Sequence, residues 1–158
     1  MARSTKQLTI GKHEYELMTL GALKGAELWL DLLRIIAVPI EALASKEKAG
    51  EDEIVTAIAA AVRSIDHATA AKFYAAFGPM SKVRVPGQSV GEPERWPTLE
   101  GAVFDDHFAG NYVEMTEWLV QSIKFNFLGF FGDGSLASLA AKVRAATKDL
   151  KSTTTSTG

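Results

Sequence analysis

Two polar clusters in the sequence hold residue types that could do chemistry. Ser64, Asp66 and His67 supply a hydroxyl, a carboxylate and an imidazole, but catalytic triads are assembled from distant segments rather than from neighbours. Helix capping explains this cluster better than hydrolysis does. Cysteine is absent from the chain, which excludes thiolate chemistry. We therefore expect neither a nucleophile elbow of the G-x-S-x-G type nor nucleophilic catalysis, and the chain is not expected to be an enzyme.

The second cluster, Asp105, Asp106 and His107, contains the residues most like metal ligands. One such cluster lacks the further histidine or carboxylate partners that complete a coordination shell, and we do not expect His13 or His67 to supply them. Instead, one of the two aspartates is expected in the first turn of a helix, where the helix dipole favours negative charge. These residues predict neither a metal site nor a cofactor.

Two glycine-rich segments are candidates for phosphate-binding loops. The segment 129–134 lacks the Lys-Ser/Thr ending and the strand–helix context of a P-loop, so its glycines are interpreted as a hinge. The segment 87–91 has no helix N-terminus directly behind it. We expect no nucleotide site at either segment.

Composition and charge exclude further classes of function. The 158 residues carry 17 Lys and Arg against 19 Asp and Glu, whereas nucleic-acid-binding domains usually present a clustered basic face. The basic residues that accompany Trp96 stand among glutamates and are expected on a solvated loop; they are Lys82, Arg84 and Arg95. No apolar run reaches the length of a membrane span, and the N-terminus lacks the apolar core of a secretory signal. We expect a protein of the cytoplasm with neither nucleic-acid nor membrane partners.

The elements that must position these residues begin with a hairpin and a long helix. Alternating residues on both sides of Gly11-Lys12 predict a small β-hairpin over 7–17. Apolar residues three and four apart then predict an amphipathic helix over 22–45. Pro39 is expected to kink or split this helix near Val38, because its ring clashes with the preceding turn and it donates no hydrogen bond.

The middle of the chain is predicted to contain two shorter helices and a loop. Apolar spacing predicts a helix over 54–65, and Asp66 is expected to cap a third helix that Gly78-Pro79 ends. Prolines and glycines are dense over 80–101, which excludes a long helix there. A loop is expected, with a brief strand at 83–85.

A continuous apolar seam marks a fourth predicted helix over 104–131. The seam is expected to be core up to Ile123, but large rings are more numerous here than one seam can bury. For Trp118 and the rings from Phe125 onward, a place in the core and a place at an interface are both open. With the apolar edge of a last helix, the candidate partner-binding residues are Trp118, Phe125, Phe127, Phe130, Phe131, Leu136, Leu139 and Val143.

The predicted fold class is mainly α: a small domain of about five helices with a short N-terminal β-hairpin. Residues 1–132 are expected to form the helical domain, and 133–151 a C-terminal helical arm with Ser135 as its cap. The small polar residues 152–158 have nothing to bury and are expected to be a disordered tail.

Three segments carry a family resemblance: LTIGKHEYEL with GALKGAELW, then WPTLEGAVFDDHFAGNYVEMTEWLVQSIKFNF, then GFFG. In their order they resemble the tail assembly chaperones of long-tailed bacteriophages and related prophages. The resemblance implies a mainly helical protein that binds the tape-measure protein, recruits tail-tube protein and offers apolar helical surface to its partners, with self-association expected. It supplies no catalytic residues.

Two other classes of function stay open beside the chaperone. In a structural tail-completion or minor tail protein, the same apolar surface would be a permanent interface within the virion. An enzyme or ligand-binding domain would require a concave polar site, for instance around Asp105, His107 and Glu114.

Overall fold

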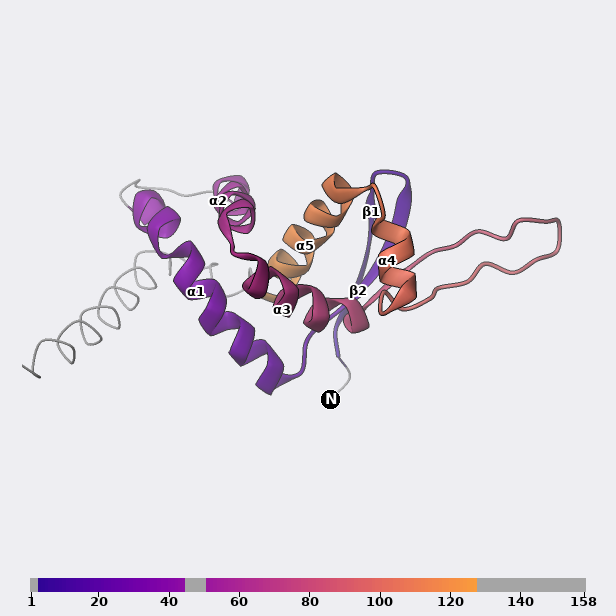
Figure 1. Ribbon diagram of the computed structural model, residues 1–158, viewed down its shortest axis with the longest axis horizontal. Coiled ribbons are helices and arrows are strands. Elements are labelled where there is room, and N and C mark those ends of the chain that lie inside the picture. Colours follow the sequence, from indigo (N-terminus) through magenta and orange to yellow (C-terminus); the bar gives the residue numbers. More distant parts are fainter. Residues whose placement is uncertain (1–2, 45–50, 128–158) are drawn as a thin grey trace, which may run out of the picture.

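A computed structural model describes residues 3–44 and 51–127 of the chain (Figure 1). This part is mainly helical and begins with a β-hairpin, so the predicted fold class is confirmed. The predicted arm over 133–151 and the tail lie outside the described residues. The elements are β1 (Thr5–Ile10), β2 (His13–Met18), α1 (Ala22–Ala44), α2 (Glu51–Ser64), α3 (His67–Phe77), the 3-10 helix η1 (Gly78–Met80), β3 (Ser81–Val83), α4 (Ala102–Phe108) and α5 (Tyr112–Phe127).

The hairpin is part of a three-stranded antiparallel sheet in the order β1-β2-β3. Gly11 has a φ of 58°, the left-handed conformation that lets a two-residue turn join β1 to β2. On β2, Tyr15 and Leu17 lie on the same face, because alternate residues of a strand do, and both are buried. The strand expected at 83–85 lies two residues earlier, at 81–83, where it pairs with β2.

Helices α1, α2 and α3 form where the apolar spacing predicts them. Of the kink or split expected near Val38, the split is not observed: α1 continues through Pro39 to Ala44, because the turns on both sides tolerate the loss of one hydrogen bond inside a long helix. Asp66 caps α3 as predicted, since its carboxylate accepts the backbone N–H of Thr69 at 2.7 Å. None of the described helices is long and apolar enough to cross a membrane.

The single helix predicted over 104–131 is wrong, because the chain forms two helices, α4 and α5. Between them, Gly110 has a φ of 71°, a left-handed conformation that commonly ends a helix. The backbone N–H of Asn111 then donates to the carbonyl of Phe108 at 2.9 Å, which closes the turn. This turn places the last turn of α4 beside the first turn of α5.

Between β3 and α4 the chain forms a long loop that projects away from the rest of the molecule (Figure 1). At its base, Val85 and Arg95 exchange backbone hydrogen bonds of 2.8 and 2.9 Å. The guanidinium of Arg84 contacts the carboxylates of Glu14 and Glu94, both at 2.6 Å. Arg84 therefore pairs with acidic neighbours, and Arg95 is exposed, as expected for a solvated loop.

Candidate functional site

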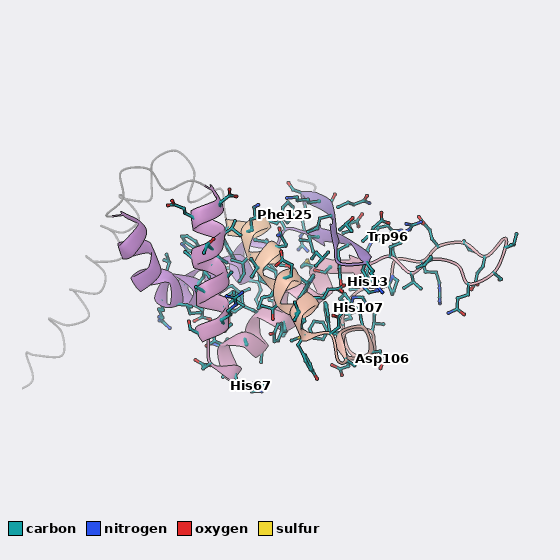
Figure 2. The ribbon with its side chains drawn as sticks, turned by 90° about the horizontal axis from the view of Figure 1, so that it is seen from above. His13, His67, Trp96, Asp106, His107 and Phe125 are labelled. Carbon is teal, nitrogen blue, oxygen red and sulfur yellow. The ribbon has the colours of Figure 1, made fainter. Side chains whose placement is uncertain are left out.

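A polar cluster joins β2, α4 and α5, and we define it as His13, Tyr15, His107, Asn111 and Glu114. His13 opens β2 directly after the Gly11 turn, and Tyr15 follows on the same face of the strand. His107 lies in the last turn of α4 and Glu114 in the first turn of α5. Figure 2 shows His13 and His107 side by side, and their ring centroids are 4.7 Å apart.

Glu114 is the common acceptor of this polar cluster. Its Oε1 atom accepts a hydrogen bond from His13 Nδ1 at 2.6 Å and another from the Tyr15 hydroxyl, while Oε2 accepts from Asn111 Nδ2 at 2.7 Å. The Tyr15 oxygen also lies 2.6 Å from His107 Nε2. Because the single Tyr15 proton goes to Glu114, His107 must carry its hydrogen on Nε2 and donate it to Tyr15.

The surroundings fix the protonation states of the cluster at neutral pH. Burial raises the pKa of Glu114, but hydrogen bonds from Tyr15, Asn111 and His13 outweigh burial and hold that pKa below its usual value. Burial and the nearby His13 lower the pKa of His107, against the opposing effect of Glu114. Burial and the Glu114 carboxylate raise the pKa of the Tyr15 hydroxyl far above its usual value. Glu114 is therefore ionised, His107 neutral and Tyr15 protonated.

The expectation that His13 would not join His107 is wrong. The donor atoms of His13, His107 and Glu114 all lie within 4.8 Å of one another, in a set of two imidazoles and one carboxylate. His67 is exposed at the start of α3 and lies apart from this cluster (Figure 2). Asp105 lies in the first turn of α4, as expected for one of the two aspartates, and both aspartates are exposed.

The serine candidates lack the context of a nucleophile. Ser64 Oγ donates to the carbonyl of Ala61 at 2.9 Å within α2, and Asp66 caps α3. Residues 87–91 read Gly-Gln-Ser-Val-Gly and do match G-x-S-x-G, contrary to the expectation above. However, Ser89 lies on the exposed projecting loop, Ser89 Oγ is 3.4 Å from Glu92 Oε2, and the next helix begins only at Ala102. The strand–turn–helix geometry of a nucleophile elbow is therefore missing.

Trp118, a candidate partner-binding residue, lies at the centre of the core. It has no exposed surface, and its ring centroid lies 5.6 Å from that of Phe104 and 5.5 Å from that of Phe108. Its indole N–H donates to Ser81 Oγ at 3.1 Å, which satisfies its polar atom inside the core. Of the two alternatives open for Trp118, the structure supports the core.

Two of the candidate rings beyond Ile123, Phe125 and Phe127, are among the described residues, and both pack against the core. Phe127 is buried, with its ring centroid 5.7 Å from that of Trp29 and 6.4 Å from that of Phe77. Phe125 is partly buried and packs against the same core. Phe127 therefore belongs to the core, whereas Phe125 lies at its edge. The other candidate residues lie outside the described residues; they are Phe130, Phe131, Leu136, Leu139 and Val143.

Comparison with known proteins gives one match. Residues 11–138 match the family of phage tail assembly chaperone proteins. The chain belongs to the phage tail assembly chaperone family. Its role therefore lies in phage tail assembly in the host cell, and it interacts with tail proteins. No curated protein and no solved structure matches the chain.

The described surface of this family member presents apolar side chains at the start of α1. Leu23 is 91% exposed and Leu30 is 58% exposed, and seven residues along a helix place them on one face. Leu23 also lines an open hollow of about 510 Å³ between α1 and the end of α3. The hollow is mostly apolar, with lining residues that include Leu20, Leu23, Ala75, Ala76, Pro79 and Met80. We define Leu23, Leu30 and this hollow as the α1 surface.

Proposed function

We propose that this protein is a non-enzymatic chaperone that binds the tape-measure protein and the tail-tube protein during tail assembly in the host cytoplasm. The membership in the tail assembly chaperone family supports the general role. The observation that carries the finer proposal is the α1 surface, where Leu23 and Leu30 are exposed and Leu23 lines an apolar hollow. Such a surface fits an amphipathic helix of a partner.

The α1 surface is suited to reversible binding. An amphipathic helix presents anchor side chains at intervals of three, four and seven residues, which matches the seven-residue spacing of Leu23 and Leu30. Met80 in the hollow has a flexible side chain that adapts to different partner residues. Arg3 and Lys24 also line the hollow, so acidic residues that flank the apolar face of a partner helix would be favoured.

The end of α5 and the residues beyond it are the second part of the proposed binding surface. Phe125 packs only partly into the core, so one side of its ring reaches the surface. We also propose that Phe130 and Phe131, and a C-terminal helical arm over 133–151, contact the partner. The proposed contacts in the arm are Leu136, Leu139 and Val143. Trp118 and Phe127 support this surface from within the core and do not touch the partner.

Affinity capture after co-expression with the tape-measure protein or the tail-tube protein tests the proposal. Leu23→Ser with Leu30→Ser should reduce the captured partner about tenfold or more, because exposed aliphatic anchors are removed without loss of core packing. Val90→Ser is the matched control, since Val90 is fully exposed on the projecting loop, far along the chain from α1. Circular dichroism should show all variants folded.

Three results would contradict the proposal. No capture of either partner, by this chain or by a longer product of the same gene, would overturn the chaperone role. Detection of the protein in purified mature particles would instead indicate a structural tail-completion or minor tail protein. Equal loss of capture in the leucine double variant and in Val90→Ser would overturn the assignment of the α1 surface.

A further inference from the structure

We propose that His13 Nδ1, His107 Nε2 and Glu114 Oε1 form a binding site for one Zn²⁺ ion. Zinc in proteins prefers imidazole nitrogen and carboxylate oxygen as ligands, and three such ligands with an open fourth position form a recurrent zinc site. Among the residues that the structure describes, these three side chains form the group of histidine and acidic donors close enough to share an ion. The proposal is independent of the partners proposed above.

The distances between the donor atoms are close to what zinc needs. With bonds of roughly 2.0–2.2 Å in a tetrahedral site, ligand atoms lie about 3.4 Å apart. His107 Nε2 lies 3.7 Å from Glu114 Oε1, and His13 Nδ1 lies 2.6 Å from the same oxygen. Binding therefore requires His13 Nδ1 to move away from Glu114 Oε1 by less than about 1 Å. The side chain of His13 is the most exposed of the three, which leaves room for this shift.

The elements around the site hold two ligands firmly and leave one accessible. The side chains of Glu114 and His107 are 10% and 12% exposed, whereas that of His13 is 39% exposed. Asn111 Nδ2 holds the second oxygen of Glu114 at 2.7 Å, which orients the carboxylate as outer-shell partners do in metal sites. An ion can therefore enter past His13, the most exposed of the three side chains.

Zinc would replace the hydrogen atoms that His13 Nδ1 and His107 Nε2 now donate. In the metal-free protein, His13 Nδ1 donates to Glu114 and His107 Nε2 donates to Tyr15. Each nitrogen must present a lone pair to the metal, so it gives up the hydrogen that it now carries, either to the other ring nitrogen or, where that nitrogen already carries one, to solvent. The zinc-bound rings carry hydrogen only on Nε2 in His13 and Nδ1 in His107. No covalent bond is made or broken elsewhere, and the Tyr15 hydroxyl can still donate to Glu114.

Calorimetric titration of the untagged, metal-free full chain with ZnCl₂ tests the site. We expect one Zn²⁺ per chain and a rise in the thermal unfolding midpoint at saturating zinc, because the ion binds the folded state. His13→Asn, His107→Asn and Glu114→Gln should each weaken affinity at least about 100-fold, and Asn111→Ala about 10- to 100-fold, as for an outer-shell partner. His67→Asn, an exposed histidine on α3, is the matched control and should leave affinity unchanged.

A measurement on the unmodified chain covers the case in which a variant fails to fold. Long-range ¹H–¹⁵N correlation spectra distinguish histidine tautomers, and zinc should shift His13 and His107 to the forms named above while His67 stays unchanged. Absence of saturable one-to-one binding at micromolar zinc would overturn the proposal. So would unchanged affinity in folded His13, His107 and Glu114 variants, or spectral changes confined to His67.

Discussion

Replacement of Trp118 by alanine tests whether this ring belongs to the core or to an interface. The side chain is fully buried against the rings of Phe104 and Phe108 and donates one hydrogen bond to Ser81. Truncation of a buried aromatic side chain to alanine costs about 3–5 kcal/mol. Ser81 Oγ still donates to the carbonyl of Phe77 at 2.9 Å, so its hydroxyl keeps one partner and adds little to this cost.

This cost is large relative to the stability of a domain of this size. Against a total of about 5–15 kcal/mol, Trp118→Ala should leave a folded but much weakened protein. Its thermal midpoint should fall by about 6–20 °C, at roughly 2–4 °C for each kcal/mol. Urea denaturation followed by circular dichroism measures the free energy of unfolding directly. Trp118→Phe should cost less, about 1–2 kcal/mol, because it keeps a ring and removes only the N–H and part of the packing.

Tyr112→Ala is the matched control for Trp118→Ala. Tyr112 is an aromatic residue of the same helix, α5, and is 66% exposed, so its truncation should change the free energy of unfolding by less than about 0.5 kcal/mol. The reasoning would be refuted if Trp118→Ala cost less than about 1 kcal/mol while capture of a tail protein was lost. That result would assign the ring to an interface.

Three further predictions concern backbone space, capping and pH. Gly78→Ala should destabilise the fold by about 1–3 kcal/mol in urea denaturation, because the added Cβ would lie 2.4 Å from the Leu99 carbonyl oxygen. Gly25→Ala is the control: its Cβ would make only an ordinary contact in α1, so it should stabilise the fold by about 0.5–1 kcal/mol. Asp66→Ala should cost about 0.5–2 kcal/mol as α3 loses its cap, and an unchanged midpoint would contradict the capping role. In the metal-free protein the pKa of His107 is lowered, so the unfolded chain takes up a proton at this residue more readily than the folded one. The free energy of unfolding should therefore fall as pH falls below about 6.5. Denaturation at several pH values should show that His107→Asn removes this part of the pH dependence.

The sequence predicts much of the fold because local signals dominate the first three helices. Asp66 supplies a cap and Gly78-Pro79 a stop, and both act within a few residues of the chain. The turn at Gly110 is missed because the apolar spacing continues across it: Phe108 and Leu119 both lie in the core although they belong to different helices. A glycine followed by asparagine was the available signal for that turn.

The polar cluster could not be predicted from local signals. His13 and Glu114 are 101 residues apart in sequence, and their contact depends on how the hairpin packs against α4 and α5. Two parts of the cluster could have been predicted from the sequence. His13 and Tyr15 share one face of a strand because alternate residues do, and the charged Glu114 lies beside the predicted core seam. The packing of the hairpin against α5 could not be predicted, because the spacing of apolar residues within one element carries no information about which other element it contacts.

The burial of the aromatic seam constrains where a tail assembly chaperone of this kind can bind its partners. Trp118 and Phe127 contribute their area to the core, and the polar cluster ties the hairpin to the same two helices, so exposing those rings would disrupt packing and hydrogen bonds together. Binding that left the core intact must therefore use apolar groups that the core does not need. Leu23 and Leu30 meet that condition, since their removal leaves the buried face of α1, with Leu28 and Leu32, unchanged. We infer that this protein binds its partners through the outer face of α1, through Phe125 at the end of α5 and through residues beyond Phe127, while the buried residues of the aromatic seam hold those surfaces in place.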